Sequence, residues 1–112
     1  DDTASVKLLE FVLDKTSISI GDSIAFSFSV LAEKEVKARL EYGIDYVKSN
    51  GRRSRKRFKI SEVTLKENEE RSYEKKHSFK DLSTRKHYPG IHSIAIIVNG
   101  AERDKLDFSL EK

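Results

Sequence analysis

The residues of this chain most able to do chemistry lie in one short basic segment near its middle. Between residues 48 and 59 there are seven cations and no carboxylate: Lys48, Arg52, Arg53, Arg55, Lys56, Arg57 and Lys59. Guanidinium and ammonium groups bind phosphate oxygens, and the planar fork of arginine fits them especially well. Ser49, Asn50 and Ser54 add neutral donors of the kind that position a protein on a phosphate backbone. We therefore expect a polyanion as the partner of this segment.

Part of this charge has a plainer explanation. Lysine and arginine protect exposed edge strands from aggregation, and that role accounts for two or three cations but not for a crowded, self-repelling run. A second basic group is more dilute, because Glu74 and Asp81 lie within it. Its members are Lys75, Lys76, Lys80, Arg85, Lys86 and His87. The sequence leaves open whether the second group joins the same surface as the first.

Catalytic chemistry has no comparable support. The chain has no cysteine, which excludes disulfides, thiolate metal sites and cysteine nucleophiles. Motifs of serine hydrolases, phosphate-binding loops, dinucleotide-binding folds and zinc proteases are absent. His77, His87 and His92 have no acidic or thiol neighbour at the spacing of metal ligands. We predict no catalytic residue, no cofactor, no metal and no small-molecule substrate in these residues.

Composition also bears on the compartment. No apolar run approaches the roughly 20 residues that cross a bilayer, and the first residues are acidic rather than signal-like. The absence of cysteine fits a reducing environment. We expect a cytoplasmic protein without membrane contact, and the missing initiator methionine suggests a piece of a longer chain.

Alternation of apolar and polar residues, typical of half-buried strands, recurs along the whole sequence. It is clearest over residues 24–30, 36–44, 94–98 and 106–110, and weaker over 6–13, 58–65 and 71–79. Asn99-Gly100 predicts a tight hairpin, because both central residues of a type I′ turn need positive φ. We expect an all-β fold, an antiparallel sandwich of seven to eight strands that forms one domain over residues 1–112. A closed barrel is the competing architecture.

The basic segment enters a strand whose apolar pattern is broken. Phe58 and Ile60 have one parity and Val63 and Leu65 the other, which predicts a β-bulge or a switch between sheets. If Phe58 and Ile60 point inward, the outward side chains form a row that could follow a phosphate backbone. That row is Arg53, Arg55, Arg57 and Lys59.

One apolar face has no evident cover. Ala95 and Ile97 lie on the side of their strand opposite Ile94 and Ile96. Either a loop covers them, or they form a docking patch for a partner. The second possibility defines an alternative function, a protein-docking or scaffold domain that binds no nucleic acid and carries the basic loop for solubility.

Several phrases of the sequence suggest a family. They span residues 40–48, 50–51, 54–56, 58–60, 76–80, 84–92 and 97–100, and the similarity runs from about residue 9 to 110. Together they resemble the carboxy-terminal domain of bacterial DNA alkylation repair proteins of the AlkC type. The resemblance implies an immunoglobulin-like sandwich, although the core cystine and tryptophan of antibody-type domains are missing here.

In that family the domain is appended to a HEAT-like-repeat DNA glycosylase of base excision repair. The helical repeats hold the catalytic carboxylate and remove lesions such as 3-methyladenine, so no catalytic residue carries over to this chain. The implied partners are the backbone of double-stranded DNA and the helical-repeat domain of the same parent chain. On matching positions, the resemblance implies DNA contact by the loop from Asn50 to Lys59 and by the loop that holds Arg85, Lys86 and His87.

Overall fold

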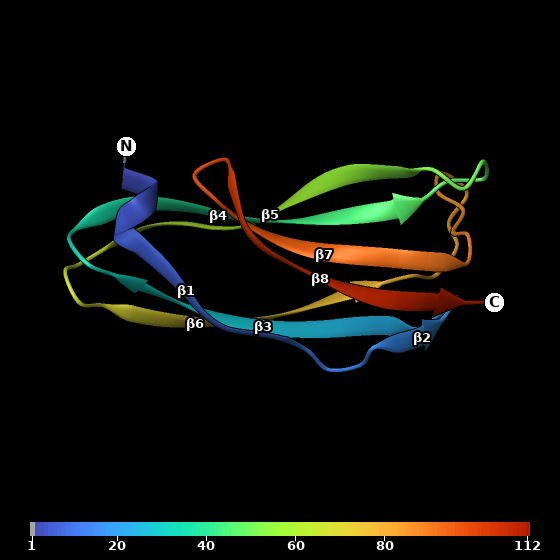
Figure 1. Ribbon diagram of the computed structural model, residues 1–112, viewed down its shortest axis with the longest axis horizontal. Helices are drawn as coiled ribbons and strands as arrows, with labels where there is room; N and C mark the ends of the chain where they lie inside the picture. Colours follow the sequence, from blue (N-terminus) through green and yellow to red (C-terminus); the bar gives the residue numbers. More distant parts are fainter. Residues whose placement is uncertain (1) are drawn as a thin grey trace.

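The computed structural model describes residues 2–112, and strands dominate it (Figure 1). After a 3₁₀ turn over Asp2–Ser5 come β1 (Val6–Leu13), β2 (Ser17–Ser19), β3 (Ser23–Ala32), β4 (Val36–Val47), β5 (Arg53–Leu65), β6 (Glu70–Ser78), β7 (Gly90–Val98) and β8 (Ala101–Glu111). The predicted all-β class is confirmed. No helix in the described part of the chain is long and apolar enough to cross a membrane.

The strands form two separate sheets, with the orders β1-β3-β6 and β2-β8-β7-β4-β5 (Figure 1). The architecture is therefore the sandwich, and the competing barrel was wrong. Every pair of strands is antiparallel except β2 and β8, where Ser17–Ser19 runs parallel to the end of β8. The three-residue β2 was not expected, because it is too short to show an alternating pattern.

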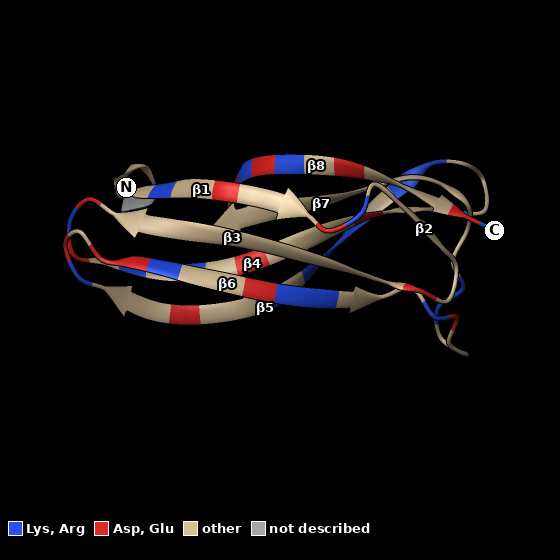
Figure 2. Cartoon of the chain, turned by 90° about the horizontal axis from the view of Figure 1, so that it is seen from below, with Lys and Arg blue, Asp and Glu red and all other residues tan. Residues whose placement is uncertain are grey.

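The core lies between the sheets and explains the alternation of the sequence. β3, which carries no charged residue and is tan throughout in Figure 2, contributes Ile24, Phe26 and Phe28. β4 and β7 face it with side chains such as Leu40 and Ile94, which are fully buried. Burying each such side chain contributes about 1.5–3 kcal/mol to folding, which fixes the register of both sheets.

Two hairpin turns of the sandwich contain glycines with positive φ. Asn99 and Gly100 both have positive φ, 49° and 85°, so the predicted type I′ hairpin is confirmed. The β4–β5 turn is wider: the Gly51 N–H donates to the Lys48 carbonyl at 2.9 Å, and the Lys48 N–H donates to the Arg52 carbonyl at 2.7 Å. Gly51 closes it at φ 82°, a conformation that favours glycine.

The broken parity of β5 has the predicted cause. Leu40 pairs with Ser61 but Glu41 pairs with Lys59, which leaves Ile60 as an extra residue in a bulge. Phe58 and Ile60 pack against the core before and within the bulge, and Val63 packs there after it. The strand therefore keeps an apolar inner side from Phe58 to Leu65.

The molecule is elongated, with extents of 45 × 23 × 21 Å. The β4–β5 turn and the β6–β7 loop meet at the right end in Figure 1, and the β3–β4 and β5–β6 turns lie at the left end. The two left-hand turns show both red and blue segments in Figure 2, and their sequences hold more acids than cations: Glu33, Glu35, Glu67 and Glu69 against Lys34 and Lys66. The long axis thus separates acidic turns from the basic loops.

Candidate nucleic-acid interface

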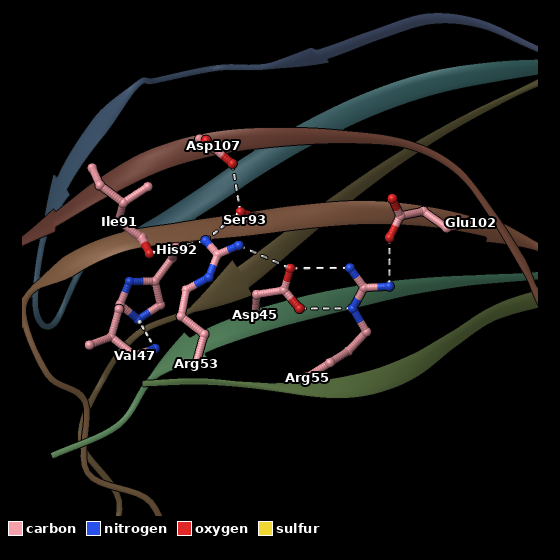
Figure 3. Close-up of polar contacts among 9 residues, drawn as sticks. All are labelled: Asp45, Val47, Arg53, Arg55, Ile91, His92, Ser93, Glu102 and Asp107. Carbon is pink, nitrogen blue, oxygen red and sulfur yellow. Dashed lines mark hydrogen bonds and ion pairs between the residues drawn. The ribbon is translucent and has the colours of Figure 1, made fainter. Parts of the chain in front are cut away.

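Arg55 of β5 is held by carboxylates from two other strands (Figure 3). Its Nε and Nη2 donate to the two carboxylate oxygens of Asp45 at 2.8 and 3.1 Å, and its Nη1 lies 2.7 Å from Oε1 of Glu102. Asp45 is only 8% exposed, and its hydrogen bonds with Arg55 hold the pKa of that carboxyl below its usual value. The same bonds raise the pKa of the Arg55 guanidinium, so this pair remains charged.

The reach of Arg55 depends on a glycine. Because the sheet order is β8-β7-β4-β5, a side chain from β5 must cross β4 and β7 to meet Glu102 on β8. It crosses β4 over Gly43, where an added Cβ would lie 3.0 Å from Cδ of Arg55. On β7 the residue that pairs with Gly43 is the small Ala95. Small residues on both intervening strands let the arginine lie flat on the sheet.

This crossing corrects the expectation for the apolar face of β7. Ala95 and Ile97 are 0% and 1% exposed, so they form no open docking patch. The register places Ile97 between Glu41 and Glu102, both of which take part in ion pairs with arginines of β5. Long charged side chains cover the face, rather than the loop or the partner that the sequence suggested.

Arg53 lies on the same sheet face (Figure 3). Its Nη1 donates to Oγ of Ser93 at 2.8 Å and to the Ile91 carbonyl at 3.3 Å, and its Nη2 lies 3.7 Å from Asp45. Ser93 in turn donates to Asp107 at 2.6 Å. We call these connected side chains the arginine network: Asp45, Arg53, Arg55, Ser93, Glu102 and Asp107. It joins β5, β4, β7 and β8.

The predicted outward row of cations is therefore only partly free. Arg57 lies 4.0 Å from Glu41 and keeps 48% of its side chain exposed. Among the described residues, four cations of the segment have no ion pair: Lys48, Arg52, Lys56 and Lys59. Lys56 instead lies 5.4 Å from the centre of the Phe58 ring. Asn50 uses its side-chain oxygen within the turn, where it accepts the Arg52 N–H at 2.9 Å.

The structure brings parts of the two basic groups together at one end. The β4–β5 turn and the β6–β7 loop border a hollow of about 340 Å³, which is lined by Tyr46, Val47, Lys48, Ser49, Thr84, Arg85, Lys86 and Tyr88. We call residues 48–52 and 79–89 the loop pair. Arg52, Lys48 and Lys86 are exposed there, and Arg85 is half-buried. Lys75 and Lys76 remain apart, on β6.

The β6–β7 loop is ordered by its own hydrogen bonds. Leu82 and Arg85 exchange backbone bonds of 2.8 and 3.2 Å, and the Asp81 carboxylate accepts the His87 N–H at 2.8 Å. The Arg85 guanidinium lies 4.3 Å from the centre of the Tyr46 ring, a cation–π contact that ties the loop to β4. The backbone that presents Arg85 and Lys86 is therefore fixed before any partner binds.

His87 does not lie on the surface, in contrast to its expected place among the contact residues. Its side chain is 5% exposed, and its ring centre lies 5.0 Å from that of Phe79 and 5.7 Å from that of Tyr46. Burial lowers the pKa of His87, so its imidazole is neutral near pH 7. Of its two basic neighbours, Lys86 is exposed and Arg85 is half-buried.

Two further histidines support the loop pair from inside. His77 lies between the hydroxyls of Tyr42 and Tyr46, at 2.9 and 2.8 Å, and burial lowers its pKa to about 4. His92 accepts the Val47 N–H at 3.3 Å and donates to the Gly90 carbonyl at 3.1 Å, which fixes its neutral tautomer. Burial also raises the pKa of Tyr46 to about 12. Within residues 2–112, no group of three or more acidic, histidine or cysteine side chains could hold a metal.

Sequence reasoning missed the carboxylates that neutralise the arginines. Asp45 and Glu102 lie outside the basic segment, so a count along the chain does not detect them. A signal for Asp45 did exist, because it lies five residues before Asn50 and Arg55 five residues after it. Sequence reasoning also missed Thr84, which lines the hollow together with Ser49.

Comparison with known proteins places this geometry in a family. The family model of the C-terminal immunoglobulin-like domain of the uncharacterised protein YhaZ matches residues 7–112. The chain belongs to this family. YhaZ of Bacillus subtilis (strain 168) is 45% identical over 106 residues, which cover 95% of this chain and 30% of that relative. The chain thus spans less than a third of the length of the curated relative it matches.

A solved structure adds a link to DNA repair. The chain is similar to the alkylpurine DNA glycosylase AlkC of Pseudomonas fluorescens bound to DNA that contains an abasic-site analogue, with a TM-score of 0.93 and 31% identity. The match covers 96% of this chain and 31% of the glycosylase. A β-glucosidase of Listeria innocua matches with a TM-score of 0.72 but 14% identity, which shows the shared fold alone. The predicted immunoglobulin-like sandwich is confirmed.

Proposed function

We propose that this chain is a non-catalytic accessory domain that grips the backbone of double-stranded DNA within a bacterial alkylation-repair DNA glycosylase. The observation that carries the proposal is the loop pair, where two basic segments far apart in sequence border one hollow. Lys48, Arg52 and Lys86 have no ion pair among the described residues, so their charge is available. The similarity to a glycosylase bound to DNA supports the same proposal.

The mechanism is electrostatic. Cations of the loop pair replace counterions along the phosphate backbone, which favours binding without reading the base sequence. Lys56, Arg57 and Lys59 extend the basic surface along the edge strand β5. Arg53 and Arg55 act indirectly, because the arginine network holds the start of β5 against the sheet. His87 acts as packing beneath the loop.

The remaining parts of the proposal concern the longer protein. Since the chain covers 30% of its curated relative, catalysis would belong to residues outside it. We place the catalytic carboxylate in a helical-repeat domain of the same parent chain, which acts in base excision repair in the bacterial cytoplasm. This domain would add affinity for DNA and take no part in the chemical step.

A salt titration tests the proposal. Fluorescence anisotropy with a short DNA duplex, between about 25 and 150 mM salt, should give a dissociation constant of roughly 10⁻⁴–10⁻⁶ M. Four or five phosphate contacts predict a log–log salt slope of about −4, the same for unrelated base sequences. The proposal fails if the folded chain does not bind at the lowest salt, or if binding is independent of salt.

A further inference from the structure

The hollow of the loop pair has cationic walls on both sides. Lys48 and Ser49 come from the β4–β5 turn, and Thr84, Arg85 and Lys86 come from the β6–β7 loop. No carboxylate is among the residues that line it. Cations that line one hollow repel each other, so an anion bound there is favoured.

The other lining residues narrow the chemistry of the anion. Ser49 and Thr84 offer hydroxyl donors from opposite walls, a set that suits phosphate oxygens. The Tyr46 hydroxyl is engaged with His77 at 2.8 Å, and Arg85 lies over the face of the Tyr46 ring. The face of the Tyr46 ring beneath Arg85 is therefore already covered and is not open to a stacked base.

Both walls are held in place before a ligand arrives. The turn is closed by the bonds between Lys48, Gly51 and Arg52, and the loop by the exchange between Leu82 and Arg85. Preformed walls lower the entropy lost on binding.

We propose that this hollow is a subsite for a single phosphate group, which Lys48 and Lys86 bind jointly together with Arg85. The inference rests on the proposed function in one respect: in the DNA complex, the occupant is one backbone phosphodiester. The two loops then clamp the same phosphate instead of binding separate ones.

A first experiment uses inorganic phosphate and the isotopically labelled chain. Two-dimensional NMR should show saturable shifts confined to the amides of residues 48–49 and 84–86. Chloride at matched ionic strength should produce much smaller shifts, and Lys86→Ala should weaken phosphate binding at least about threefold. Shifts spread over all exposed cations, or equal shifts with chloride, would overturn the subsite.

A second experiment counts how many phosphates of a DNA duplex the two lysines neutralise. Each neutralised phosphate contributes about 0.9 to the salt slope, so Lys48→Ala combined with Lys86→Ala should lower its magnitude by about 0.9. A loss of about 1.8 would mean two separate phosphates and would overturn the shared subsite. Lys37→Ala combined with Lys66→Ala, near the acidic turns, is the matched control and should leave the slope unchanged.

The two proposals fail in different ways. If phosphate shifts the NMR signals of the residues that line the hollow but the duplex does not bind, the DNA function is wrong. The subsite then serves a free phosphate group. If the duplex binds but phosphate does not perturb the hollow, the function stands and the subsite is wrong.

Discussion

The arginine network and the loop pair contain cations that lie only a few residues apart in the sequence. The cations of the network are paired with carboxylates, whereas those of the β4–β5 turn are not. Arg53 and Arg55 lie 2.7–3.7 Å from the carboxylates of Asp45 and Glu102. Lys48 and Arg52 have no ion pair among residues 2–112. The difference arises from the sheet, because β4 and β8 hold acids within reach of the arginines of β5, whereas the turn projects beyond the strands. Strand pairing, rather than local charge density, decides which cations are available to a partner.

The largest expected effect is a loss of stability at low pH, which arises beneath the loop pair and not in the arginine network. His77 beneath the loop pair has a pKa of about 4, against an ordinary value of 6.5. The unfolded chain therefore binds protons first, and stability that is complete above pH 6.5 is lost as pH falls towards 4. We expect the free energy of unfolding to drop by up to about 3 kcal/mol between pH 7 and 4.

Urea denaturation at several pH values measures this drop. Hydrogen bonds with Arg55 lower the pKa of Asp45, so the arginine network should contribute little to this drop. His77→Gln keeps a hydrogen-bonding side chain but does not titrate, and should flatten the profile. An equally steep profile in that variant would contradict the role assigned to His77.

The second effect breaks the arginine network. Asp45→Ala leaves two arginines without their shared carboxylate, and should lower the free energy of unfolding by about 2–3 kcal/mol. The exposed Asp104 on β8 is the control, and Asp104→Ala should cost less than about 0.5 kcal/mol. Chemical denaturation compares them, and equal losses would show that the network contributes nothing to stability.

The third effect depends on the shape of the cation. Arg55→Lys keeps the charge but loses the two parallel bonds to Asp45, and should cost about 1–2 kcal/mol of stability. Arg52→Lys, in the exposed turn, should change stability by less than about 0.5 kcal/mol. Thermal denaturation distinguishes the two variants. If Arg55→Lys leaves stability unchanged, charge alone is enough to hold β5 against the sheet.

The smallest effect concerns the outer end of the network. Glu102 keeps 41% of its side chain exposed, so its ion pair with Arg55 is screened by solvent. Glu102→Gln should cost less than about 1 kcal/mol, and the cost should shrink at high salt. A larger, salt-independent cost would mean that Glu102 contributes as much to stability as Asp45 does, and would contradict this account.

Much of the fold could be predicted because burial imposes period-2 patterns. The bulge at Ile60 and the hairpin at Asn99-Gly100 were both evident in residue parity and turn chemistry. β2 was not, because three residues carry no pattern and its pairing with β8 is parallel.

The site was less predictable, since its electrostatics depend on register. A two-residue turn at Asn50-Gly51 would pair Asp45 with Lys56, whereas the wider turn pairs it with Arg55. One residue of register thus decides which cation is neutralised. The burial of His87 likewise follows from loop packing against Tyr46 and Phe79, which leaves no trace in local sequence.

Charge reversal in the loop pair tests the central claim most directly. Lys48→Glu combined with Lys86→Glu, compared with Lys37→Glu combined with Lys66→Glu, keeps the net charge of the two variants equal. Duplex affinity at low salt, with circular dichroism to verify folding, should fall at least about tenfold in the first variant and less than about threefold in the second. Equal losses would mean that only net charge matters, and unchanged affinity in the first variant would show that the loop pair does not bind DNA.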